Sequence, residues 1–242
     1  MADFREPHHL PSRGTFDPNR LPRQREGVTP QMHGRYPDHD VLSQTDHWDE
    51  VTRRVVLDRV DNPPSIRFFD ERERATLAPF CDRLTAQDIE PRIPVLSYVD
   101  EKLYENSGDG YQYFDMPSDQ ETWRRVARGL DDEARTLGVA SFDELSEHHQ
   151  LQICHRFAQG ELFGGVWATL NVSRAFSLVM RYVCAAFYAH PWSWNEIGFG
   201  GPAYPRGYAA FGNPEFGERE HWEGEEAFES DPVRDVRQQG LD

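Results

Sequence analysis

The sequence predicts an all-α protein: a compact bundle of about five helices, preceded by a long extended arm and followed by an irregular region rich in aromatic residues, glycine and proline. Three observations support this fold class. Apolar residues recur at a spacing of about 3.6 residues in successive stretches between residues 67 and 190. Helix-capping residues stand before most of these stretches, and no stretch alternates polar and apolar residues as a strand does.

Each helix of the bundle is predicted by its start signal and its apolar stripe. Asp70 with Glu73 and Ser118 with Glu121 have the spacing of capping boxes, and Pro94 is suited to the head of a helix. Ser141 with Glu144 opens a short helix, and Ser146 opens a longer one that runs to Gly160. The last helix, about 171–190, is the most apolar and is expected at the centre of the bundle. The predicted inward residues are Leu77, Cys81, Leu84, Val95, Val99, Leu103, Trp123, Ala127, Leu130, Ala134, Leu137, Leu151, Cys154, Phe157, Phe176, Val179, Met180, Val183, Ala186 and Phe187.

Four segments follow from this pattern. Residues 1–66 form an extended arm rich in proline and histidine, with a short helix at 48–60. Residues 67–190 form the helical domain, residues 191–211 an aromatic loop without regular structure, and residues 212–242 an acidic tail. The arm and the tail contain too few apolar residues to form a core, so we expect each to be either disordered or ordered by a partner.

Charge and hydropathy narrow the classes of partner. The formal net charge is −16 and the mean hydropathy is −0.76. Such a chain is repelled by nucleic-acid phosphates and by anionic membranes, so neither is an expected partner. The longest apolar run, residues 183–189, is too short to cross a bilayer, and the N-terminal residues do not resemble a signal peptide. We therefore expect a cytoplasmic protein, or one that is exported with a partner carrying the signal.

No residue pattern predicts a cofactor or metal in this chain. The cysteines Cys81, Cys154 and Cys184 form no CxxC pair, and His148 and His155 lack the further ligands that zinc requires. The segment 198–203 matches the glycine fingerprint of dinucleotide-binding proteins, but two prolines prevent the helix that this fingerprint needs.

The segment His190–Tyr208 is the best candidate for a functional site. Its aromatic residues either cover the helical core of the chain itself or form a contact with a second protein, because aromatic residues and arginine are enriched in both settings. We predict the second role, with Asn195 and Glu196 bracing the turn of the chain. The predicted contact residues are Trp192, Trp194, Phe199, Tyr204, Arg206 and Tyr208.

An enzymatic alternative uses the same segment. A glutamate among aromatic rings can have a raised pKa and exchange protons, so Glu196 together with His190 could act in a small standalone enzyme. We favour the other interpretation, in which the same glutamate accepts hydrogen bonds from loop amides and holds the turn. No nucleophile–base motif is found elsewhere, and we predict no catalytic residue.

The segment HPWSWNEIGFGGPAYPRGY and a second block, residues 68–103, resemble the gluconate 2-dehydrogenase subunit 3 family; residues 108–111 and 123–137 are also similar. The resemblance implies a small accessory subunit of an FAD-dependent dehydrogenase or oxidase of the glucose–methanol–choline type. It implies that the large subunit holds the FAD and that the complex oxidises a sugar. In many such systems a cytochrome c accepts the electrons. A redox-unrelated scaffold protein remains the other alternative.

Overall fold

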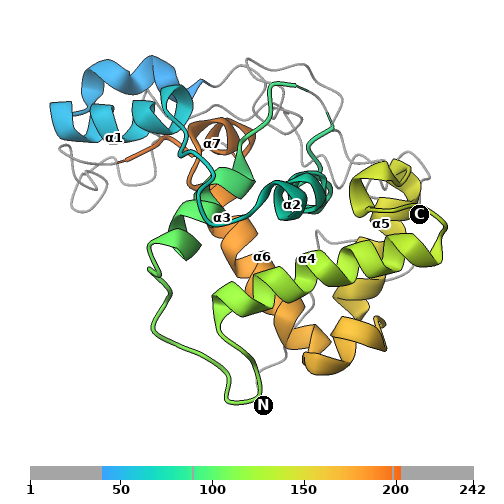
Figure 1. The fold of residues 1–242 in the computed structure, drawn as a ribbon. Helices are drawn as coiled ribbons and strands as arrows, with labels where there is room; N and C mark the ends of the chain where they lie inside the picture. The colour runs from blue at the N-terminus through green and yellow to red at the C-terminus, as the bar shows by residue number, and fades with distance from the viewer. Residues whose placement is uncertain (1–39, 89, 198, 203–242) are drawn as a thin grey trace, which may run out of the picture. The chain divides into compact units, whose positions relative to one another are not determined.

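The computed structural model describes residues 40–88, 90–197 and 199–202. These residues fall into two compact units. One spans Asp58–His190, and the other combines the chain on either side of it. Figure 1 shows the helices of both units.

The described residues form helices and connections and contain no strand, which confirms the all-α class. The α-helices are α1 (Glu50–Asp61), α2 (Glu71–Leu84), α3 (Val95–Tyr104), α4 (Asp119–Thr136), α5 (Glu147–Gln159), α6 (Val172–Tyr188) and α7 (Pro191–Ile197). Short 3-10 helices occur at η2 (Val41–His47), η3 (Phe142–Glu144) and η4 (Gly165–Thr169). The five predicted helices of the bundle correspond to α2–α6, and the predicted helix at 48–60 corresponds to α1.

Three of the predicted start signals, at Asp70, Ser118 and Ser146, cap their helices with side-chain hydrogen bonds, whereas Ser141 and Pro94 make none. The Glu121 side chain binds Arg125 and does not complete a capping box at Ser118. Asp70 and Glu73 form a complete capping box at α2, and the side chains of Ser118 and Ser146 accept backbone N–H bonds at α4 and α5. Gly160 ends α5 in the left-handed conformation that favours glycine. Because a cap satisfies N–H groups that lie within one helical turn, it can be recognised from local sequence alone.

The core of the larger unit is aromatic and aliphatic. α2 packs against α3, α4 and α5, and α6 packs against α3 and α5. Phe157 on α5 stacks with Phe80 on α2 and contacts Trp167 on η4. Trp123 on α4 makes an edge contact with Tyr182 on α6. These side chains are almost fully buried, so the bundle is held mainly by apolar burial.

Two predicted core residues are exposed. Leu137 follows the last turn of α4 and Leu151 lies on the outer face of α5; both are about half exposed, 49% and 50%. Their predicted inward orientation is wrong. Leu137 lies beyond the end of α4, where the helical phase no longer applies, and Ile153 and Phe157 bury the inner face of α5 instead.

A buried carboxylate joins α3 to the entry of α2. Asp100 is fully buried, and its two oxygens accept hydrogen bonds from the backbone N–H groups of Arg67, Phe68 and Phe69 at 2.7–3.1 Å. These amides precede the helix, where no helical carbonyl can accept their bonds. Asp100 therefore fixes the direction in which the chain enters the bundle.

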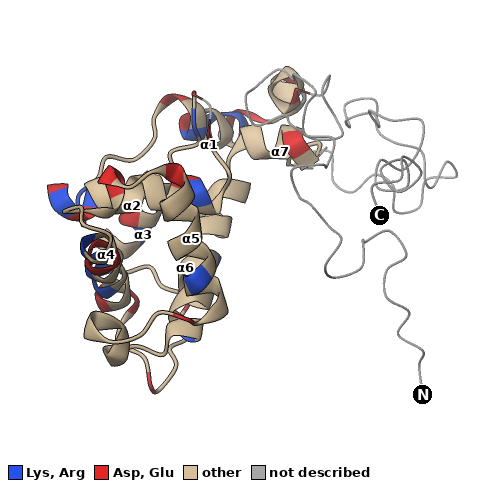
Figure 2. Ribbon diagram, turned by 90° about the vertical axis from the view of Figure 1, so that its right-hand side faces the viewer, with Lys and Arg blue, Asp and Glu red and all other residues tan. Residues whose placement is uncertain are grey.

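Charge is distributed unevenly over the helices. Figure 2 shows charged residues gathered on α4, whereas α6 is mostly uncharged. This difference fits an amphipathic outer helix and a central one. Within the described ranges, no helix combines the length and the apolar character needed to span a membrane.

Candidate functional site

Helix α7 occupies the start of the segment for which the sequence predicts an irregular loop. That prediction is wrong for Pro191–Ile197. Proline is favoured in the first turn of a helix because its missing N–H has no partner there in any case. The first glycine of the segment comes only at position 198, so no helix-breaking residue lies between it and Pro191. The prediction rested on the glycine and proline content of the whole segment, and most of those residues come after this short helix.

Trp194 on α7 belongs to the core of the smaller unit. Its side chain is only 6% exposed and lies in a cluster with Val41, Trp48 and Val56. Val41 and Trp48 come from a part of the chain that the sequence assigns to the extended arm. Residues 41–47 instead form η2, which packs on α7. Trp194 therefore has the packing role that the sequence left as one of its two interpretations.

Asn195 fastens η2 to α7. It is fully buried, and its Oδ1 atom accepts a hydrogen bond of 2.7 Å from the backbone N–H of Val41. The predicted bracing role of Asn195 thus takes the form of a bond between segments more than 150 positions apart. The chain after α7 also passes close by: a Cβ atom on Gly201 would lie 2.9 Å from Val41 and 3.0 Å from Trp48.

The other predicted contact residues differ in exposure. Trp192 and Glu196 are partly buried, and Phe199 is about half exposed. The ring of Phe199 meets Trp194 edge-on at 5.4 Å, and its backbone N–H donates to the carbonyl of Trp194. Tyr204, Arg206 and Tyr208 lie outside the described residues. The predicted partner contact at this segment therefore stays a prediction.

His190 is a buried histidine at the end of the larger unit. Its side chain is 1% exposed, and burial lowers its pKa from 6.5 to about 4, although a hydrogen bond to the backbone of Arg59 acts in the opposite direction. Nearby, Arg59 donates a bond of 2.7 Å to the carbonyl of Ala189, which caps the negative end of α6. His190 is therefore neutral at pH 7 and placed among structural contacts.

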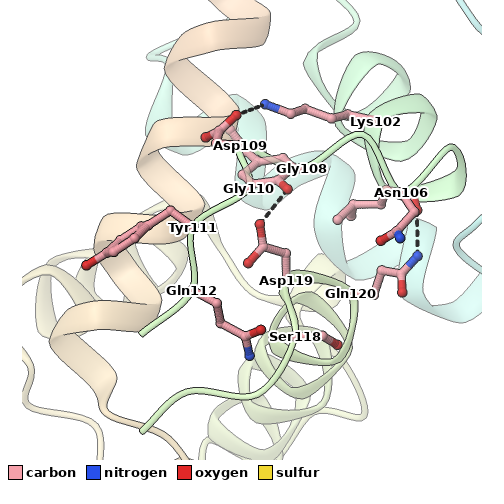
Figure 3. A pocket seen from close by; sticks show the side chains of 12 residues that line it. Lys102, Asn106, Gly108, Asp109, Gly110, Tyr111, Gln112, Ser118, Asp119 and Gln120 are labelled. Carbon is pink, nitrogen blue, oxygen red and sulfur yellow. Dashed lines mark hydrogen bonds and ion pairs between the residues drawn. The ribbon is translucent and has the colours of Figure 1, made fainter. Parts of the chain in front are cut away.

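A polar pocket of about 310 Å³ opens beside the connection between α3 and α4, in the larger unit. Figure 3 shows side chains from α3, this connection and the start of α4 arranged around it. Its polar lining residues are Lys102, Asn106, Asp109, Tyr111, Gln112, Ser118, Asp119, Gln120 and Tyr182. The sequence indicated only that residues 108–111 resemble a known family, because the pocket arises from helices whose contacts are not local in sequence.

Opposite charges in this pocket are paired with each other. Lys102 Nζ lies 2.7 Å from Asp109 Oδ1, and Arg181 Nε lies 2.8 Å from Asp109 Oδ2. The hydrogen bond from Lys102 and the nearby positive charges lower the pKa of Asp109. Tyr182 donates a hydrogen bond of 2.6 Å to Asp119. Burial of the tyrosine raises its pKa, and this hydrogen bond raises it further. The network holds the α3–α4 connection to α6.

Among the residues with a described position, no group of three or more histidine, cysteine, aspartate or glutamate side chains could hold a metal ion. The three cysteines are free thiols. Burial raises the pKa of Cys154 to about 12, so its thiol is protonated and unreactive at neutral pH.

The fold and these sites define a small helical protein whose distinctive features are paired charges and aromatic surfaces. Comparison with protein families identifies the match: residues 71–201, more than half of the chain, match gluconate 2-dehydrogenase subunit 3. The chain belongs to this family, and so to the accessory subunits of dehydrogenase complexes. No curated protein and no solved structure matches the chain in the corresponding comparisons.

Proposed function

We propose that this chain is the small, non-catalytic subunit of a heteromeric FAD-dependent dehydrogenase or oxidase of the glucose–methanol–choline type. The large subunit holds the FAD and oxidises a hydroxyl group of a sugar, sugar acid or glycoside. Electrons then pass to a cytochrome c or another acceptor. The observation that carries this proposal is the family match over residues 71–201, which includes the bundle and α7.

The small subunit supports folding and stability of the large one. A rigid helical bundle suits this role, because it offers a preformed surface and loses little conformational freedom on binding. Its core is closed by buried aromatic residues such as Trp123 and Phe157, so the bundle can fold before its partner does.

The segment that begins with α7 contributes to the contact with the large subunit. In this proposal Trp192 and Phe199 provide aromatic contact area, together with Tyr204, Arg206 and Tyr208 in the following residues. Trp194 and Asn195 support the contact from within, since both are buried against η2. Glu196 lies on α7 and takes no part in the chemistry.

Co-expression of the full chain with its candidate flavoprotein tests the assignment. The expected product is a stoichiometric complex with flavin absorbance near 450 nm in the large subunit, and a lower yield of soluble flavoprotein when the small subunit is omitted. Soluble, fully active flavoprotein that never binds the chain would contradict the proposal.

A matched pair of variants separates the accessory role from the enzymatic alternative. Glu196→Gln keeps the shape of the side chain and removes its charge, so the assembled complex should retain its turnover. Phe199→Ala should weaken assembly, by roughly tenfold or more, if this ring is an interface anchor. Loss of turnover in an intact Glu196→Gln complex would assign Glu196 a catalytic role.

A further inference from the structure

The connection between α3 and α4 is long for a helical bundle. It runs from Glu105 to Ser118 without regular structure, whereas helix–helix connections in bundles are commonly about two to eight residues. Long connections in compact domains usually serve a function, because they add nothing to the core. This one lies within the part of the chain that matches the family.

A β-turn fixes the far end of this connection. The backbone N–H of Met116 donates a bond of 3.1 Å to the carbonyl of Tyr113, so Phe114 and Asp115 occupy the two central positions of the turn. The side chain of Met116 is buried and anchors the turn on the bundle. Phe114 is thereby held at an apex of the chain.

Charged side chains hold the connection to α6 at two places. Asp115 is bound by Arg174 and by the amide of Asn171, both at the start of α6. Asp109 is bound by Lys102 and by Arg181, two turns further along α6 from Arg174. Fixing a long loop in this way costs conformational entropy, and this loop forms no new apolar core to offset that cost.

The aromatic side chains that the connection presents remain in water. Phe114 is 96% exposed and Tyr111 is 55% exposed. The Arg174 guanidinium lies 4.5 Å from the centre of the Tyr113 ring and 5.9 Å from the centre of the Phe114 ring. A single exposed aromatic residue is ordinary, but rings fixed in place on a tethered turn have the preorganisation of interface anchors, which lose little entropy on binding.

We propose that the segment Tyr111–Phe114, which leads into this turn, is an anchor that inserts into the dehydrogenase subunit of the complex; this inference rests on the proposed function above. The partner offers apolar pockets for the two rings. Asp109 and Asp115 are each neutralised within the chain, so the turn brings no unpaired carboxylate into the contact. The net charge of −16 favours approach of a basic face.

The size of the anchor indicates that it is part of a larger contact. Two fully exposed rings would bury at most about 300–500 Å², and these two bury less because Tyr111 is only 55% exposed. A stable interface buries about 800 Å² per partner. An anchor of this size suits a heteromeric contact that other surfaces of the chain complete, and it is too small to hold two copies of this chain together by itself.

The test compares exposed residues at opposite ends of α4. Phe114→Ala and Tyr111→Ala alter the turn before this helix, and Leu137→Ala alters an exposed apolar residue after it. All three side chains are at least about half exposed, so thermal unfolding of the full chain should be nearly unchanged. Binding to the purified flavin-containing dehydrogenase subunit should fall by roughly thirtyfold or more for Phe114→Ala, by less for Tyr111→Ala, and by less than about twofold for Leu137→Ala.

A photo-crosslinking residue at position 114 supplies a second readout in the assembled complex. Crosslinks to the dehydrogenase subunit, absent when the residue stands at position 137, would support the anchor. Crosslinks only to a second copy of this chain, or equal binding by Phe114→Ala and the wild type, would overturn it while leaving the accessory role intact. Failure of the wild-type chain to bind any flavin-containing dehydrogenase would overturn both.

Discussion

The substitution Gly129→Ala tests how tightly η4 packs on α4. Gly129 lies in the middle of α4, where alanine would ordinarily stabilise the helix by about 1 kcal/mol. Here a Cβ atom would lie 2.6 Å from Cε2 and Cζ2 of Trp167. Carbon atoms prefer a separation of about 3.5–4.0 Å, so the indole would have to move by roughly 1 Å.

The surroundings of Trp167 resist that movement. The ring is 3% exposed and packs against Phe157 at 5.1 Å, and Phe157 in turn contacts Phe80 and Phe176. Overpacking of this kind costs about 1–3 kcal/mol. At the upper part of that range it outweighs the gain in helix propensity, and we expect a net loss of about 1–2 kcal/mol. For a chain of this size the melting temperature should fall by about 2–8 °C.

Thermal unfolding followed by circular dichroism at 222 nm measures the effect. The double variant Gly129→Ala with Trp167→Phe provides the control, because the smaller ring removes the atoms that clash. The two substitutions should be strongly non-additive: the free energy of unfolding should fall by less in the double variant than the sum of the two single losses predicts. A rise of the melting temperature in Gly129→Ala alone would refute the reasoning, since it would show that η4 does not press on α4.

Three further predictions concern buried polar groups. Asp100→Ala should destabilise the bundle by about 3–5 kcal/mol in urea unfolding, because the amides of residues 67–69 lose their acceptor; Asp100→Asn should cost less, and equal losses would contradict this account. The pKa of His190 is about 4 in the folded chain and 6.5 in the unfolded one, so the unfolded state binds more protons between these values. Wild-type stability should therefore fall by up to about 3 kcal/mol from pH 6.5 to pH 4 relative to His190→Gln, as measured by unfolding across that range; parallel pH profiles would argue against a neutral buried imidazole. Asn195→Ala should leave the buried amide of Val41 without its acceptor and cost the smaller unit about 1–3 kcal/mol, detected as faster amide exchange at Val41, whereas unchanged exchange would show that this bond does not hold η2.

The sequence by itself determined the elements that depend on local interactions. The capping box at Asp70, the serine caps at Ser118 and Ser146, and the left-handed Gly160 all act within one or two helical turns. Family membership could also be recognised from the sequence, because it depends on a linear pattern of residues.

Only the tertiary structure decided which surfaces those elements present. The Asn195–Val41 bond joins segments far apart in the chain, so no local pattern could reveal that residues 41–47 are folded or that Trp194 is buried. Periodicity also could not show that Leu137 is exposed, since it says which side chains share a helical face but not where that helix ends. Phe114 is exposed because it lies on a turn that is fixed from two sides. Arg174 on α6 binds Asp115, and the buried side chain of Met116 anchors the turn in the core. Sequence patterns report spacing along one segment, whereas burial depends on what other segments bring into contact with it.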